Sequence, residues 1–141
     1  MTLRQNIIAE ARKYLGVKYE YRGRSAAGLD CAGLLYVVFN ALIEVGSDFQ
    51  DYPLYPKSAK VFANIRHYAQ RIKKSDAGPG DLVLMNFSGC SSHFGIITDT
   101  GVIHSDTDIG KVIEHALPDK NVLGGRRIAH FRMKGVPVWQ N

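Results

Sequence analysis

The sequence is poor in the features that mark several classes of protein. Two cysteines in 141 residues are too few for the disulfide framework of a small secreted domain, and no Cys/His spacing is typical of a structural zinc site. The longest apolar run, Ala32–Phe39, is too short to span a bilayer. Met1–Asn6 lack the basic-then-apolar pattern of a signal peptide. These absences predict no structural zinc site, no export signal and no membrane insertion, and the sequence implies no metal or organic cofactor.

The composition favours a single globular domain over residues 1–141. Apolar residues make up 45% and charged residues 22% of the chain, which is ordinary for a domain large enough to bury a core. The formal net charge of +5 should attract a polyanion, either nucleic acid or an acidic cell wall. Because no nucleic-acid-binding motif accompanies this charge, a basic nucleic-acid binder ranks below the functions considered next.

The hydrophobic periodicity divides the chain into helices first and strands afterwards. We expect helices over residues 2–15 and 31–45, and a third from Ser58 to about Lys73. After the breaker Gly78-Pro79-Gly80 the period becomes strand-like, and the predicted strands are 81–87, 93–98, 102–105, 111–116 and 126–133. This order predicts an α+β fold, with N-terminal helices packed on an antiparallel sheet of about five strands.

One cysteine lies where a helix should begin. Asp30 is a good N-cap, and Leu29 and Leu34 are spaced for a hydrophobic staple around it. Cys31 is then the first helical residue, where the helix dipole favours a thiolate. A cysteine can also be a small buried hydrophobe, but core filling gains nothing from a helix start. The position therefore indicates a nucleophile.

The five histidines differ in their setting. His93 opens a predicted strand and His104 closes the next, so a tight hairpin at 99–101 would make them cross-strand neighbours. A base and a second group that orients its ring need this arrangement. Two histidines on a hairpin could also bind a metal, but no third ligand is predicted beside them. We expect His67 to be a surface residue, and His115 and His130 to be structural or surface residues.

The stretch around Cys31 resembles the nucleophile motif of the NlpC-type cell-wall peptidases, which are papain-like cysteine hydrolases. The matching positions are Tyr19, Gly23, Gly28, Asp30, Cys31 and Gly33. The departures are Tyr21 for the usual tryptophan, Arg22 for the first glycine of a pair, Leu29 for phenylalanine and Ala32 for serine. Three later segments match in the right order, namely Pro79–Val83, His93–Ile97 and Val102–Ser105. The tail 125–132 is also similar to the subfamily encoded with phage tails and gene transfer agents.

The resemblance implies a papain-like fold and a catalytic triad. In it Cys31 is the nucleophile, His93 is the base and His104 is the third member that orients the base. Asp106, just beyond the predicted strand, is the rival for the third position. Cys90, three residues before His93, is expected to be a bystander, although it could form a disulfide with Cys31 or serve as a rescue nucleophile.

The resemblance also implies the groups that contact the substrate. The backbone N–H of Cys31 and the hydroxyl of Tyr19 would stabilise the oxyanion. Arg22 and Arg24 would border the cleft and suit an anionic substrate.

The function implied by the resemblance is cleavage of peptidoglycan stem peptides, at the bond between γ-D-glutamyl and the diamino acid. The alternatives are a muramoyl-alanine amidase or an injected amidase toxin, and a non-catalytic wall-binding tail module. A wall enzyme that is made in the cytoplasm without a signal peptide must be carried out, released by lysis or injected. We therefore expect proteins of a phage tail or another injection device as partners, and a site of action at the cell wall, with association to a virion as one route.

Overall fold

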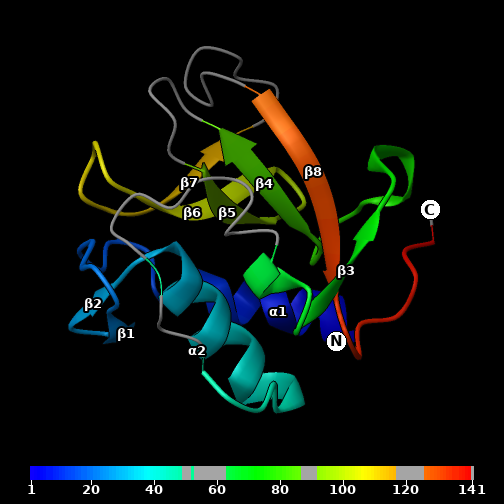
Figure 1. Ribbon diagram of the computed structural model, residues 1–141, viewed down its shortest axis with the longest axis horizontal. Coiled ribbons are helices and arrows are strands. Elements are labelled where there is room, and N and C mark those ends of the chain that lie inside the picture. Colours follow the sequence, from blue (N-terminus) through cyan, green and yellow to red (C-terminus); the bar gives the residue numbers. More distant parts are fainter. Residues whose placement is uncertain (49–51, 53–62, 87–91, 117–125, 141) are drawn as a thin grey trace.

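The described part of the computed structural model comprises residues 1–48, 52, 63–86, 92–116 and 126–140, with the side chains of 86, 92–93 and 126–128 left out. Two helices and a small hairpin precede a large sheet (Figure 1). The elements are α1 Leu3–Arg12, β1 Arg24–Ser25, β2 Gly28–Leu29, α2 Cys31–Ile43, β3 Ala69–Ile72, the 3-10 turn η1 Lys74–Asp76, β4 Leu82–Asn86, β5 Ser92–Ile97, β6 Gly101–Asp106, β7 Lys111–Ala116 and β8 Arg126–Met133.

The large sheet has six strands in the order β3-β8-β4-β5-β6-β7, and each neighbouring pair is antiparallel. Helices α1 and α2 lie together on one side of it (Figure 1). This arrangement confirms the predicted α+β fold. The sequence predicts about five strands because it misses β3.

The helix predicted from Ser58 to Lys73 is wrong in its second half. Residues 63–65 are helical, but Ala69–Ile72 form strand β3 along β8. The spacing of Ile65 and Ala69 correctly indicates burial, since both belong to the core. Burial alone does not choose the conformation, because the edge of β8 offers backbone partners that a local pattern cannot reveal. Residues 53–62 lie outside the described part of the chain.

The two predicted N-terminal helices are present and slightly shorter than expected. Helix α1 begins with a capping box, in which the Thr2 hydroxyl accepts from the Gln5 N–H at 3.1 Å and the Gln5 side chain accepts from the Thr2 N–H at 2.8 Å. Helix α2 ends at Ile43, where Glu44 takes a left-handed conformation with φ 52°. Helix ends fray in this way without changing the fold.

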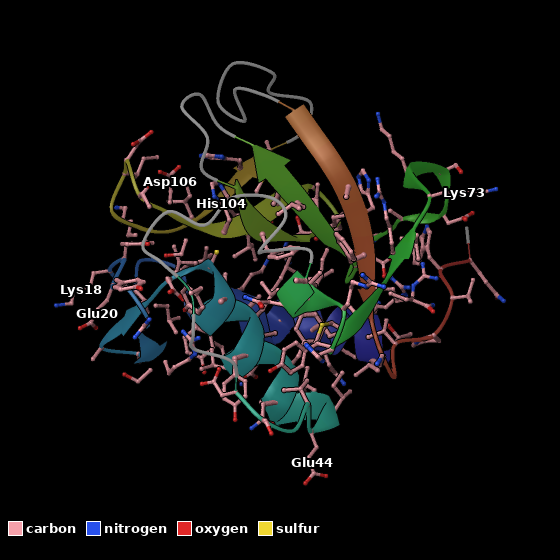
Figure 2. All side chains as sticks on the ribbon, in the orientation of Figure 1. Lys18, Glu20, Glu44, Lys73, His104 and Asp106 are labelled. Atoms are coloured by element: carbon pink, nitrogen blue, oxygen red, sulfur yellow. The ribbon has the colours of Figure 1, made fainter. Side chains whose placement is uncertain are left out.

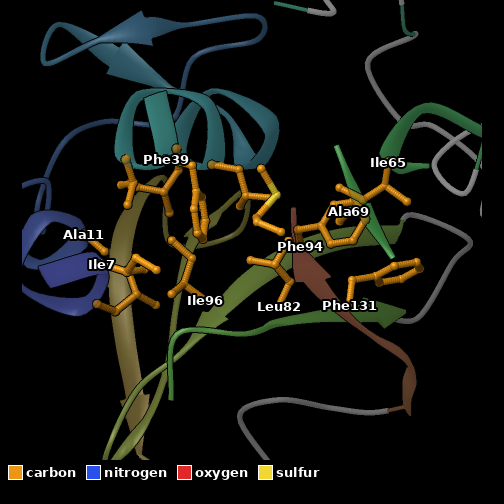
Figure 3. Packing of buried hydrophobic residues seen from close by; sticks show 14 of the residues in the cluster. Ile7, Ala11, Phe39, Ile65, Ala69, Leu82, Phe94, Ile96 and Phe131 are labelled. Atoms are coloured by element: carbon orange, nitrogen blue, oxygen red, sulfur yellow. The ribbon is translucent and has the colours of Figure 1, made fainter. Parts of the chain in front are cut away.

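The core lies between the two helices and the sheet. Figure 3 shows Ile7 of α1 and Phe39 of α2 packed toward Leu82 and Ile96 of the sheet. A second, small group on the other face of the sheet consists of Val83, Met85 and Val102. Successive strand residues alternate between these faces, and the core therefore fixes which side chains of β5 and β6 face away from the helices.

A buried ionic cluster joins α1 and β8 to the start of β4. Asp81, which is 0% exposed, accepts from Arg132 through Nε and Nη2 at 2.9 Å each. Arg4 lies 3.2 Å from the same carboxylate, and the Gly78 N–H donates to it at 3.0 Å. The Asp of the Pro-Gly-Asp segment is therefore a structural residue.

We expect Asp81→Asn to lower the free energy of unfolding by about 3–5 kcal/mol, because it leaves two buried guanidinium groups without their counter-charge. The measurement is urea unfolding followed by circular dichroism. Asp99→Asn is the matched control: Asp99 also pairs with an arginine, Arg12 at 2.7 Å, but its side chain is 62% exposed, so the loss should stay below about 1 kcal/mol. Equal losses in the two variants would contradict the structural role of Asp81.

Candidate active site

The predicted helix start at Cys31 is confirmed. Helix α2 begins at Cys31, and the Asp30 side chain accepts from the Gly33 N–H at 2.8 Å as its N-cap. The first N–H groups of a helix have no acceptor within the helix. The backbone N–H of Cys31 is one of these groups, in the place where an oxyanion donor is expected.

Asp30 does more than cap the helix. It is 2% exposed, and each carboxylate oxygen receives two donors. Oδ1 accepts from Gly33 and from Nη1 of Arg24 at 3.0 Å. Oδ2 accepts from the Arg22 N–H at 2.8 Å and from the Tyr52 hydroxyl at 2.5 Å. With its lone pairs used in this way, Asp30 holds the preceding loop against the start of the helix.

Two glycines of the motif permit this close contact between loop and helix. A Cβ on Gly33 would lie 1.9 Å from the carbonyl oxygen of Gly23, and a Cβ on Gly23 would lie 2.3 Å from the carbonyl oxygen of Gly28. Both distances are far below any van der Waals contact. Larger residues would push the loop away from the start of α2.

The expectation that Arg24 borders an anion-binding cleft is wrong. Its Nε lies 3.0 and 2.9 Å from the two carboxylate oxygens of Asp48, its Nη1 binds Asp30, and its Nη2 donates to the Tyr52 hydroxyl at 2.9 Å. The guanidinium is thus committed to the protein itself. The pKa of Tyr52 is raised, first by burial and then by its hydrogen bond to Asp30, while the contact with Arg24 acts in the opposite direction.

Arg22 and Tyr19 remain close to the nucleophile loop. Arg22 is exposed, donates from Nη2 to the Tyr52 carbonyl at 3.1 Å and lies with Cζ 5.0 Å from the Tyr21 ring centre. Tyr19 is half-buried and forms a bridge with Leu29, two residues before Cys31. Their predicted roles toward substrate stay predictions.

The Cys31 thiol is less acidic than its helix position suggests. Burial and the neighbouring Asp30 charge raise its pKa to about 12, although the N–H groups of Phe94 and Ala32 and the charge of Arg24 act in the opposite direction. Desolvation outweighs the helix start. The thiol is therefore protonated at neutral pH, and the sequence-based expectation of a stabilised thiolate does not hold for the free protein.

Strand β5 brings the backbone beside the predicted base close to Cys31. The Phe94 N–H hydrogen-bonds the Cys31 sulfur, and Phe94 follows His93 directly in the strand. The backbone of His93 pairs with Met85 of β4. Two distant stretches of sequence therefore meet at this point, although the side chain of His93 lies outside the described part of the structure.

The register of β5 and β6 differs slightly from the expected hairpin. Ile96 pairs with Ile103 and Ile97 with Val102, which makes His104 level with Gly95 rather than with His93. The two histidine positions are therefore diagonal neighbours, a separation that long side chains bridge.

His104 lies beside two polar side chains, His115 and Asp106, whose contact with it the sequence does not predict. It is 0% exposed, and its Nε2 lies 3.1 Å from Nδ1 of His115, with ring centres 4.8 Å apart. Asp106 lies beside it on β6 (Figure 2). One ligand atom from each of these three residues falls within 4.8 Å of the others.

The prediction for His115 missed this contact. His115 pairs with Val102, and His104 pairs with Ile113, so the two histidines are diagonal on one face of the β6–β7 hairpin. A register drawn across the turn at 107–110 could have found it. His67 is exposed as predicted, and His130 is 6% exposed, which agrees with a structural role. Cys90 lies outside the described residues.

The sequence profile of the NlpC/P60 family matches residues 16–127. The chain belongs to the NlpC/P60 family. Three curated relatives are a probable endopeptidase p60 of Listeria grayi, 34% identical over 77% of this chain, a probable endopeptidase p60 of Listeria monocytogenes, 34% identical over 74%, and Protein P54 of Enterococcus faecium, 31% identical over 64%. The chain spans about a fifth or less of each relative, namely 19%, 19% and 15%.

Solved structures of NlpC/P60 proteins share the fold. The NlpC/p60 domain of the peptidoglycan hydrolase SagA aligns with a TM-score of 0.57 and 25% identity, covering 81% of this chain and 89% of that one. A Bacillus cereus protein of the family aligns with a TM-score of 0.65 and 20% identity, covering 92% of this chain and 39% of that one. RipD of Mycobacterium tuberculosis, described as a non-catalytic NlpC/p60 domain protein, aligns with a TM-score of 0.54 and 14% identity. The alignment covers 94% of this chain and 95% of that one.

No helix in the described ranges combines the length and the apolar character needed to cross a membrane. Helix α2, the longer of α1 and α2, has 13 residues, whereas a spanning helix needs about 20.

The raised pKa of Cys31 predicts the pH dependence of its alkylation. Because only the thiolate reacts, we expect the rate with iodoacetamide to keep rising through pH 9–10, where the rate of an ordinary cysteine, with a pKa of about 8.5, levels off. The measurement uses a Cys90→Ser background and mass spectrometry of the Cys31 peptide, with a short cysteine peptide as control. A plateau of the Cys31 rate below pH 8 would show a stabilised thiolate instead.

Proposed function

We propose that this NlpC/P60 domain is a cysteine endopeptidase of bacterial peptidoglycan, with Cys31, His93 and His104 as its triad. One observation carries the proposal. The thiol of Cys31, at the start of α2, receives a hydrogen bond from the N–H of the residue that follows His93 in β5. The backbone next to the proposed base thereby meets the proposed nucleophile from a distant part of the chain, and covalent catalysis requires these two groups to be close.

The resting thiol determines the order of the proposed steps. Its pKa of about 12 means that the thiol rests protonated, so a base must remove its proton during the attack. His93 takes the thiol proton as sulfur attacks the carbonyl carbon, and the oxyanion is held by the Cys31 N–H and the Tyr19 hydroxyl. His93 then gives the proton to the leaving amine. Water, deprotonated by His93, releases the acyl group.

His104 acts on this reaction through His93. A base histidine must present one ring nitrogen as an acceptor to the thiol, which requires the other nitrogen to donate. His104 can accept that second N–H. Its own Nε2 then carries a proton and donates to His115 Nδ1, 3.1 Å away. The buried position of His104 on β6 suits this orienting role, and Asp106, also buried on β6, is its rival for the same role.

The proposed substrate is the peptidoglycan stem peptide, cut between γ-D-glutamyl and the diamino acid. The names of two similar proteins, a probable endopeptidase and a peptidoglycan hydrolase, support an endopeptidase that acts on peptidoglycan. The net charge of +5 favours association with an anionic wall. Arg22 is exposed in the loop before Cys31, and we propose that it contacts the anionic groups of the substrate. Transport by a phage tail or another injection device stays a prediction.

The alternative function is a non-catalytic wall-binding domain, and the similarity to RipD is the observation that supports it. RipD, which has this fold, is described as a non-catalytic protein adapted to peptidoglycan binding. A domain that only binds has no need for Cys31, His93 and His104 together, and all three are present here.

Digestion of purified peptidoglycan followed by mass spectrometry of the fragments tests the function. We expect new amino groups on the diamino acid, and loss of more than about 1,000-fold in rate for Cys31→Ala, because the nucleophile is removed. Cys90→Ala is the matched control and should remain active. New amino termini on the sugar-linked alanine residues would show the amidase alternative, and binding of the wall without any new termini would show the non-catalytic one.

The orienting role of His104 predicts a graded series. His104→Ala should lower kcat by about 100- to 10,000-fold with KM little changed, because the lost interaction forms mainly in the transition state. His104→Gln and His104→Asn should retain more activity, since an amide oxygen can accept the same hydrogen bond. Asp106→Asn should have a much smaller effect on kcat. Near-normal activity of His104→Ala beside an inactive Asp106→Asn would assign the third position to Asp106.

A further inference from the structure

Three side chains suited to metal binding meet on β6 and β7, and the proposed reaction involves only one of them directly. We propose that His104, Asp106 and His115 form a Zn²⁺ site, and that occupation of this site switches the hydrolase off. The ion-binding part of the proposal is independent of the reaction, and the switching part rests on the proposed function. The sequence predicts no third ligand beside His93 and His104. In the structure, Asp106 on the same strand and His115 on β7 both lie close to His104.

The two imidazoles already have the separation that zinc requires. Nε2 of His104 and Nδ1 of His115 are 3.1 Å apart. Two nitrogens that each lie at about 2.0–2.1 Å from a tetrahedral zinc ion are about 3.3 Å apart. The ion can therefore replace the shared proton with little movement of either ring.

Asp106 provides a carboxylate oxygen for the third position. In the described structure both hydrogen bonds to its side chain end on Oδ1, from the Asp108 N–H at 2.7 Å and the Ile109 N–H at 3.0 Å. These bonds fix the carboxylate and leave Oδ2 for the ion. Since the three ligand atoms lie within 4.8 Å of one another, closing on a zinc ion requires an inward shift of at most roughly 1.5 Å.

The donor set selects the type of ion. Two imidazoles and one carboxylate suit zinc, whereas magnesium and calcium prefer oxygen ligands throughout. His104 and Asp106 are buried, and half-buried His115 gives the ion a path from solvent. Three protein ligands leave the fourth position for water, so the site is expected to release the ion when a chelator is added.

Zinc would reverse the hydrogen-bonding role of His104. A neutral imidazole has one N–H and one lone pair. Without the ion, Nε2 carries the proton, and the other nitrogen accepts from His93. When zinc takes the lone pair of Nε2, the proton must reside on the other nitrogen, which then donates and cannot orient His93. The nucleophile and base stay in place, but the base loses its partner.

Titration of the apo protein with Zn²⁺ and Co²⁺ tests the binding. We expect one equivalent to bind in the Cys31→Ala/Cys90→Ala double variant, with Co²⁺ giving visible bands of low symmetry and no sulfur charge-transfer band. His115→Ala and Asp106→Asn should each weaken binding by more than about 10-fold, since removal of even an outer-shell partner costs ~10–100-fold. His67→Ala, which removes an exposed histidine outside the cluster, is the matched control and should bind normally. Circular dichroism checks that each variant is folded, and His115→Gln repeats the test if His115→Ala is not.

The overturning result is loss of the ion in the double cysteine variant together with full binding in His115→Ala, because that pattern would place zinc on the thiol. Turnover is then measured with zinc or with EDTA for each variant. Zinc should inhibit the unmodified protein at the concentration at which it binds, and His115→Ala should be less sensitive relative to its own rate in EDTA. Binding without inhibition would overturn the switch and leave the site. Absence of hydrolysis in EDTA would overturn the proposed function, while the titration would still decide the site.

Discussion

The carboxylate of Asp30 is the interaction on which the arrangement of the nucleophile depends. It caps the start of helix α2, holds the Arg22–Arg24 loop and accepts from the Tyr52 hydroxyl, all while almost completely buried. A buried carboxylate is stable only when its lone pairs are satisfied, and here the donors come from both sides of Cys31 in the sequence. The hydrogen bonds that neutralise Asp30 therefore also determine where the thiol lies.

This way of holding the nucleophile has a consequence for its chemistry. The packing around the loop desolvates the thiol, and the charge of Asp30 acts on it. Both effects raise the pKa of Cys31, against the helix start that would lower it. A thiol that is neutral at rest is less open to unselective oxidation and alkylation. Its activation depends on a base, so the relation between α2 and β5 is decisive for the proposed reaction.

The polar groups behind the base are organised by the sheet. Strands β6 and β7 carry two histidines and an aspartate on one face, where the helices do not pack. Their contacts follow from the register rather than from spacing along the chain, because residues on the same face of antiparallel strands meet across the ladder. A histidine in this cluster has more than one possible partner, and its tautomer depends on which partner it takes. The chemistry of His104 is thus a property of the hairpin.

Local signals in the sequence determined the helix starts, the later strands and the identity of the motif. Asp30 before Cys31 and Thr2 before Gln5 are caps that act within a few residues, and the alternation along residues 111–116 is a strand pattern in any context. Tertiary structure decided the rest, since each missed feature depends on groups far apart in the chain. Ala69–Ile72 became a strand at the edge of β8, Arg24 was committed to Asp48, and desolvation set the acidity of Cys31. His115 joined His104 only through the register of β6 and β7, because a pattern read along one strand carries no information about its partner.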